Sequence, residues 1–145
     1  MTRGVFVSVM ALLLGATATS TEAQNKADSM NIKMTIAGQI ITATLDDSHS
    51  ARDFFAMLPL TLPLEDYAGT EKIAYLPRKL TTQDAPKGID PDAGDITYYA
   101  PWGNLAIFYR DFGYSTGLIK LGRIESGLSH LTTTSAASIT IEAIE

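Results

Sequence analysis

The sequence has no cysteine, which excludes disulfides, thiolate metal sites and cysteine nucleophiles. It also lacks an excess of basic residues, because 11 Lys and Arg stand against 16 Asp and Glu and give a formal net charge of -5 at pH 7. Such a chain offers no basic surface to a phosphate backbone, so we expect no nucleic acid partner. With 46% hydrophobic and 19% charged residues among 145, the composition is that of one globular domain.

Long hydrophobic runs are also lacking. The apolar stretch of residues 5–16 is well short of the roughly 20 residues that a membrane-spanning helix needs. It follows the basic Arg3 and precedes small residues, which is the pattern of a secretory signal peptide. We expect cleavage after Ala23, with Ala18 as a second candidate, export to a periplasm or the cell exterior, and no membrane insertion afterwards. The chain is thus divided into a signal peptide, a short linker and one domain, at residues 1–23, 24–30 and 31–145.

Alternation of apolar and polar residues predicts a β-hairpin at the start of this domain. Apolar residues occupy every second position from Ile32 to Ile36 and again from Ile41 to Leu45, with Gly38 between the two runs. A short amphipathic helix is expected next, over residues 50–57, with Ser50 as its N-cap and Pro59 beyond its end.

Short strands separated by turn residues fill the rest of the domain. An acidic turn is expected at Glu65 and Asp66, and the polar residues 81–95 are expected to form a long surface loop. The pattern predicts a mainly β domain, a small closed antiparallel β-barrel capped by one or two short helices. The further strands are expected at residues 60–64, 72–75, 96–100, 105–110, 118–123 and 138–144.

Several strings resemble cyclophilins. The segment GQIITATLDDSHSARDFFAM, from Gly38, is similar to the opening strand, acidic loop and helix of that family, while LGRIESGL and SITIE resemble later strands. Residues 58–80 and 94–124 look still more like bacterial cyclophilin-like proteins of unassigned function. The resemblance covers about residues 32–144 and implies the cyclophilin-like fold without a biochemical role.

The residues that prolyl isomerases of this family use are not matched. Their stretch of Arg, Phe and Gln-Gly-Gly-Asp is absent, and Arg78 is the one nearby residue that could hydrogen-bond a twisting prolyl amide. An alignment through Gly103 places Ile107 where cyclophilins carry a pocket Phe and Leu105 where they carry a Gln. The resemblance therefore keeps isomerase activity only as an alternative that depends on Arg78.

Aromatic residues concentrate in one segment, with seven between Tyr98 and Tyr114. We expect Phe108 and most of the others to be core, since large aromatic side chains dominate core packing. At the junction of a strand and a turn, however, side chains can leave the barrel wall. A cleft is therefore predicted at Tyr99, Trp102, Asn104 and Ile107.

Other possible sites have simpler interpretations. The aspartates of residues 90–95 lack the remaining ligands of a calcium loop, and Asp46 and Asp47 suit the start of a helix. His49 and His130 are each flanked by Ser, but no Gly-x-Ser-x-Gly turn accompanies either of them. We expect no metal and no cofactor.

Three functions remain open on the sequence alone. The first is a non-catalytic module that binds a peptide or small molecule in the aromatic cleft. The second is a weak or altered peptidyl-prolyl isomerase with Arg78 as catalytic residue, and the third is an interaction protein that acts through its acidic surface. The oligomeric state is left open.

Overall fold

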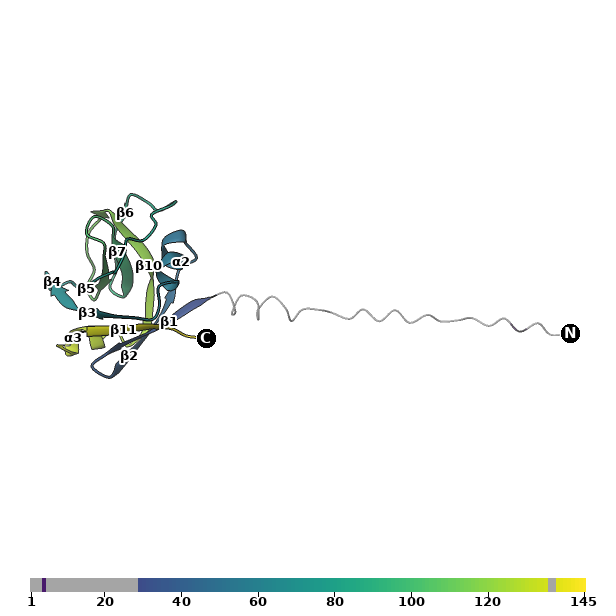
Figure 1. Cartoon of the computed structure of the whole chain (residues 1–145), viewed down its shortest axis with the longest axis horizontal. Coiled ribbons are helices and arrows are strands. Elements are labelled where there is room, and N and C mark those ends of the chain that lie inside the picture. The colour runs from purple at the N-terminus through teal and green to yellow at the C-terminus, as the bar shows by residue number, and fades with distance from the viewer. Residues whose placement is uncertain (1–3, 5–28, 136–137) are drawn as a thin grey trace.

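Strands dominate the described part of the chain in this computed structural model (Figure 1). The structure describes Gly4, residues 29–135 and residues 138–145, so the predicted signal peptide, apart from Gly4, and most of the linker lie outside the described residues. Across the described ranges, no helix is both long and apolar enough to cross a membrane. The strands are Met30–Ile36 (β1), Gln39–Leu45 (β2), Leu60–Pro63 (β3), Glu65–Tyr67 (β4), Glu71–Tyr75 (β5), Gly88–Ile89 (β6), Asp95–Tyr99 (β7), Asn104–Phe108 (β8), Ser115–Thr116 (β9), Leu118–Ser126 (β10) and Ser138–Ala143 (β11); the helices are His49–Phe55 (α2) and His130–Thr133 (α3).

Nine of the strands form one antiparallel sheet in the order β3-β11-β1-β2-β10-β7-β8-β5-β4. The terminal strands of this order, β3 and β4, follow each other in the chain with only Leu64 between them, so the sheet curls into a nearly closed barrel. The other two strands, β6 and β9, pair separately. The prediction of a mainly β, antiparallel barrel with two short helices is confirmed.

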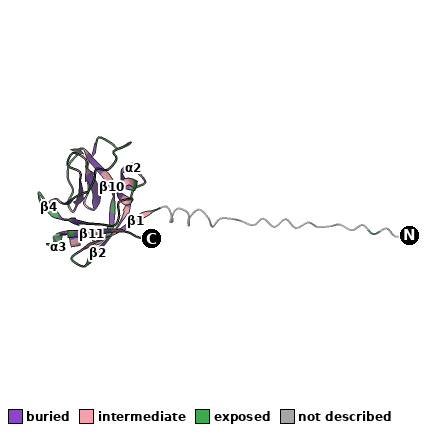
Figure 2. Cartoon of the chain, in the orientation of Figure 1, coloured by how far each residue is buried: buried purple, intermediate pink, exposed green. Residues whose placement is uncertain are grey.

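The first hairpin shows how the sequence pattern builds the core. The side chains that alternate in β1 and β2, from Ile32 to Ile36 and from Ile41 to Leu45, are buried inside the barrel. The turn between them uses Ala37 and Gly38, both at positive φ. Figure 2 shows the same division along the barrel, with buried residues concentrated on the strands and exposed residues on the connections.

Helix α2 covers one end of the barrel, and its start differs from the prediction. Ser48, two residues earlier than expected, is the N-cap, and its hydroxyl accepts a hydrogen bond from the Ala51 N–H at 3.1 Å. The hydroxyl of Ser50 instead donates to the Thr81 carbonyl at 2.6 Å, which ties the helix to the segment after β5. Ala51 and Phe54 are fully buried and fix the helix on the core.

The acidic turn predicted at Glu65 and Asp66 is wrong, because both residues belong to β4. The turn lies at Ala68 and Gly69, which take the positive φ angles of +55° and +66°. The Asp66 carboxylate accepts from the Gly69 N–H at 3.2 Å and supports this turn. The resulting β4–β5 hairpin extends beyond the strand expected from the sequence and pairs Tyr67 with Glu71.

The predicted surface loop of residues 81–95 contains one short pairing that the sequence does not indicate. Gly88 of β6 lies so close to Ser115 of β9 that a Cβ there would sit 2.3 Å from the Ser115 carbonyl oxygen. This pairing holds the loop beside the segment that precedes β10.

Candidate functional site

A cavity of about 310 Å³ lies against the β4–β5 and β7–β8 hairpins. Residues from these hairpins form two of its sides, and the segment from Phe112 into β10 forms the third. Its size is at the lower end of pockets that hold small organic ligands. It is lined by Tyr67, Ala68, Thr70, Glu71, Ile73, Tyr99, Trp102, Asn104, Phe108, Phe112, Ser115, Thr116 and Leu118.

The floor of this cavity is apolar and belongs to a second, smaller hydrophobic cluster. Ile73, Phe108 and Leu118 are buried there together with Ala106. Side chains of β8 alternate, so Asn104 and Phe108 line the cavity while Ile107, at 0% exposure, packs in the main core. The sequence-based cleft included Ile107, and the structure puts Phe108 in that place. Both residues are apolar, which is why the sequence did not distinguish the two faces.

Aromatic rings form the walls. Trp102, which is 50% exposed, lies edge-to-face with Tyr67 at 5.7 Å between ring centroids and 85° between planes, and with Tyr99 at 5.4 Å and 75°. Phe112 stands 6.1 Å from Phe108. These contacts favour a fixed arrangement of the rings, since edge-to-face pairs add about 0.5–1.5 kcal/mol each. Of the predicted cleft residues, the structure thus brings together Tyr99, Trp102 and Asn104.

Asn104 places an unsatisfied polar atom beside the cavity. The residue is 1% exposed, and its amide Nδ2 donates to the Leu105 carbonyl at 2.9 Å. Its Oδ1 is buried and accepts no hydrogen bond from any described residue. A buried acceptor without a donor costs about 1–3 kcal/mol. Buried polar groups without a partner are uncommon in folded proteins, so Asn104 stands out among the lining residues.

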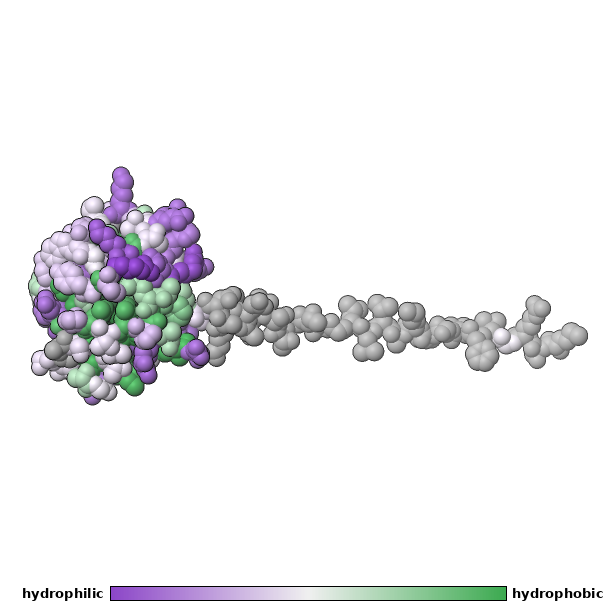
Figure 3. Space-filling model, viewed as in Figure 1, coloured by the Kyte–Doolittle hydropathy of each residue, from purple (hydrophilic) through white to green (hydrophobic). Residues whose placement is uncertain are grey.

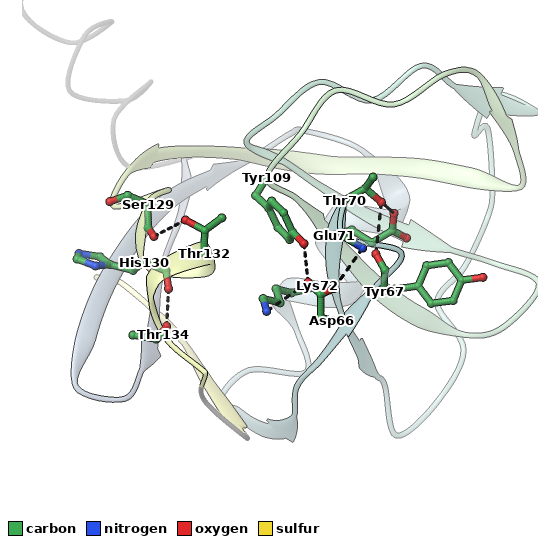
Figure 4. Close-up of polar contacts among 11 residues, drawn as sticks. Asp66, Tyr67, Thr70, Glu71, Lys72, Tyr109, Ser129, His130, Thr132 and Thr134 are labelled. Carbon is green, nitrogen blue, oxygen red and sulfur yellow. Dashed lines mark hydrogen bonds and ion pairs between the residues drawn. The ribbon is translucent and has the colours of Figure 1, made fainter.

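Glu71 supplies the carboxyl group of the cavity. It lies beside Thr70 on the β4–β5 hairpin (Figure 4). Burial raises the pKa of Glu71; the Thr70 hydroxyl, which donates to it at 3.0 Å, opposes this shift, and the charge of Asp66 adds to it. Among the described residues that line the cavity there is no Lys, Arg or His. Glu71 is therefore the one carboxyl group in this described lining.

A polar cluster on the same hairpin holds β4, β5 and the end of β8 together. The Tyr109 hydroxyl donates to Asp66 at 2.5 Å, and the Lys72 ammonium lies 3.3 Å from the same carboxylate oxygen (Figure 4). The hydrogen bond from Tyr109 holds the pKa of Asp66 below its usual range, with Lys72 adding to the effect. Burial and the bond to Asp66 raise the pKa of Tyr109 to about 12. This cluster keeps the hairpin in place behind Tyr67 and Glu71.

Arg78, the residue considered for isomerase activity, lies elsewhere. Its guanidinium pairs with Asp53 of α2 at 2.7 Å, and Asp53 also accepts from the Thr81 N–H at 2.8 Å. The bond from Arg78 is the main cause that lowers the pKa of Asp53. Arg78 is absent from the lining of both cavities described for this structure. Its contacts are those of a surface ion pair that joins α2 to the segment after β5.

A second cavity, of about 410 Å³, lies at the start of α2 and is bordered by charged side chains. His49 pairs there with Asp84 at 3.2 Å, and Arg52 pairs with Asp47. Figure 3 shows hydrophilic residues gathered at the end of the molecule where α2 and β6 lie, and hydrophobic residues across the middle of the visible face. Four ionisable side chains of this cavity thus form two pairs with one another.

The described residues contain no group of three or more His, Cys, Asp or Glu side chains placed to hold a metal ion. In the segment of residues 90–95, Asp95 is 4% exposed and pairs with Arg123 at 2.8 Å, while also accepting from the Asp92 N–H at 2.9 Å. These contacts use the Asp95 carboxylate to hold a turn against β10.

Tyr67, Glu71 and Phe112 line the cavity but are not among the predicted cleft residues. Tyr67 and Glu71 face each other across the β4–β5 hairpin, whose turn was misplaced. The sequence signal for their position is Ala68-Gly69, a small residue followed by Gly, which favours a turn between Tyr67 and Glu71. Phe112 was noticed only as part of the aromatic segment.

Comparisons with known proteins agree on the fold. The model of the Cyclophilin-like family matches residues 34–142. A solution structure of a hypothetical protein from Archaeoglobus fulgidus is similar with a TM-score of 0.59 and 16% sequence identity, over 80% of this chain and 95% of that one. A search among curated proteins finds no significant match.

Proposed function

The chain belongs to the cyclophilin-like family, and we propose that it is an exported, non-catalytic binding module whose ligand lies in the cavity against the β4–β5 and β7–β8 hairpins. The ligand is a small organic molecule or a short peptide segment. Export is supported by the apolar N-terminal segment that follows Arg3.

One observation carries this proposal: the cavity combines a buried apolar floor, aromatic walls and few polar groups. Ligand sites are mostly apolar concavities in which a small number of polar groups fixes orientation. Here Phe108 and Ile73 form the floor, and Trp102 is part of the aromatic wall. The polar groups are Asn104 and Glu71. Half of the Trp102 side chain is exposed although it packs against two tyrosines, so an occupant would bury more of it.

The isomerase alternative finds less support. It requires a cation that donates a hydrogen bond to a prolyl amide above an apolar pocket. The guanidinium of Arg78 is paired with Asp53, and Arg78 is not part of the cavity lining. The described lining of the aromatic cavity also lacks any other basic side chain.

The test is an NMR titration of the mature chain, residues 24–145, with two sets of probes. One set contains short proline peptides, and the other contains neutral, cationic and anionic phenylalkyl compounds. The single tryptophan, Trp102, gives one indole N–H signal that reports on the cavity. We expect saturable shifts of this signal and of Phe108 with at least one probe, and no acceleration of peptide cis-trans exchange.

Two variants sharpen the result. Trp102→Leu should weaken binding by about fivefold or more, because it removes an aromatic wall. Ile40→Ala changes a side chain that is 53% exposed at the β1–β2 turn and does not line the cavity, so it should bind as the unaltered chain does. Accelerated exchange would contradict a non-catalytic role, and equal binding by Trp102→Leu would contradict the location.

A further inference from the structure

The charge of the aromatic cavity has one sign. Glu71 contributes a carboxylate, and no basic residue stands among its described lining. The whole chain is acidic as well, with a formal net charge of -5. An anionic ligand would therefore meet repulsion from Glu71, while a cation would be attracted to the cavity and paired within it.

The walls favour a cation for a separate reason. The face of an aromatic ring is electrostatically negative, so it attracts a cation placed near it. Trp102 is inclined by 85° to Tyr67 and by 75° to Tyr99, so rings of different orientation border one space. A ring face that borders the cavity would therefore attract an ammonium group.

The interior polar groups complete the pattern. Glu71 lies opposite Phe108 in the pairing of β5 with β8, and Asn104 lies four residues away along β8. At about 3.3 Å per residue, this places the two groups roughly 13 Å apart along the apolar floor. The unsatisfied Oδ1 of Asn104 and the carboxylate of Glu71 are both acceptors. A ligand that places an N–H donor at Glu71 and an apolar body along the floor would match this arrangement.

From these observations we propose that the cavity binds an organic cation: a primary or secondary ammonium, or a guanidinium, carried on an apolar or aromatic body. The proposal rests on the proposed function, since it names the ligand class of the same cavity. The volume of about 310 Å³ is the volume of roughly ten water molecules in the liquid. A compound such as phenethylammonium fits this size, and so does a lysine or arginine side chain.

Burial of Glu71 makes this pairing specific. A partly buried carboxylate without a cation is disfavoured, which is the physical cause of its raised pKa. A bound ammonium would offset that cost and stabilise the ionised form of Glu71. The hydroxyl of Thr70 already donates to one oxygen of Glu71, which leaves the second oxygen for the ligand.

The experiment compares three probes of similar shape and different charge: phenethylammonium, 2-phenylethanol and 3-phenylpropionate. Each is titrated into the mature chain at pH 7 while the indole signal of Trp102 is followed. We expect phenethylammonium to bind about tenfold more tightly than the alcohol and the carboxylate to bind least. Two further probes, N-acetyl-lysine methylamide and N-acetyl-arginine methylamide, distinguish the source of the cation. Tighter binding of these would indicate a peptide side chain, and tighter binding of phenethylammonium would indicate a free amine.

Charge variants locate the effect. Glu71→Gln keeps the shape and removes the charge, so it should reduce phenethylammonium affinity by about tenfold and leave that of the alcohol within about twofold. Glu65→Gln is the matched control, because Glu65 is an exposed carboxylate on the adjacent β4 that does not line the cavity. It should preserve the preference for the ammonium. Thermal unfolding of both variants verifies that each is folded.

The outcomes separate this inference from the proposed function. If the alcohol binds as tightly as the ammonium, the cation preference is refuted while the binding role stands. The cation preference is also refuted if Glu71→Gln still prefers the ammonium to the alcohol, or if only the anionic probe or a proline peptide shifts the Trp102 signal. In both cases the binding role stands. If no probe of either set shifts Trp102, both proposals fail.

Discussion

The placement of Phe108 toward the cavity and Ile107 toward the core gives the sharpest prediction, because neighbouring residues of one strand should affect different properties. Ile107→Val removes one methyl group from a site with 0% exposure, which costs about 0.5–1.5 kcal/mol. A domain of this size then unfolds roughly 4 °C lower for each kcal/mol. Ligand binding should not change, since Ile107 lies outside the cavity lining.

Phe108→Leu should affect both properties. It removes the ring that packs 6.1 Å from Phe112, a contact worth about 0.5–1.5 kcal/mol, and it removes an aromatic surface from the cavity floor. We expect a stability loss of about 1–2 kcal/mol and about fivefold weaker binding of phenethylammonium. Urea unfolding followed by circular dichroism measures the first effect, and NMR titration measures the second. Weakened binding by Ile107→Val, with Phe108→Leu unaffected, would refute the assigned faces of β8.

Three further predictions concern ionisable groups. Arg78→Ala should cause a small loss of stability at neutral pH, measured by urea unfolding, and should leave ligand binding unchanged. Because this pair lowers the pKa of Asp53, the loss should vanish as pH falls through that pKa. A stability difference that persists in acid would contradict the pairing. Absorbance at 295 nm should show one tyrosine that titrates at about 12 and is missing in Tyr109→Phe. Since the pKa of Tyr109 is raised, its contribution to stability is complete below the unfolded pKa near 10 and is lost as pH rises toward 12. A titration curve that Tyr109→Phe leaves unchanged would contradict this assignment. Affinity for phenethylammonium should fall as acid protonates Glu71, and because the pKa of Glu71 is raised, this fall should begin above the ordinary glutamate pKa of 4.5. Asp66 and Tyr109 are the titratable neighbours of Glu71. An affinity independent of pH, or the same fall in Glu71→Gln, would exclude Glu71 as the partner of the ammonium.

The sequence predicted the barrel where alternation was clean. In β1 and β2, apolar residues at every second position leave one interpretation, and the hairpin forms as expected. In β8, Leu105 to Phe108 are all apolar, because both faces of that strand are covered. Alternation was therefore uninformative there, and the choice between Ile107 and Phe108 required the structure.

The cavity could be predicted only in part. Tyr99, Trp102 and Asn104 lie within one hairpin, so their proximity follows from the local sequence. Tyr67 and Glu71 come from another hairpin, and their position depends on the pairing of β5 with β8. The turn lies at Ala68-Gly69 although Glu65-Asp66 is more polar, because a short exposed strand at the edge of a sheet tolerates acidic residues. Similarly, the predicted cap Ser50 is replaced by Ser48, because the Ser48 hydroxyl accepts from the Ala51 N–H while the Ser50 hydroxyl donates to the distant Thr81 carbonyl.

The central claim is that a ligand occupies the cavity beside Trp102. Intermolecular nuclear Overhauser effects between bound phenethylammonium and protein side chains test it most directly. The account predicts contacts from the phenyl protons to Phe108 and Trp102, and from the carbon next to the ammonium to Glu71. Contacts confined to residues of the second cavity, such as Gln83 and Ile119, would contradict it.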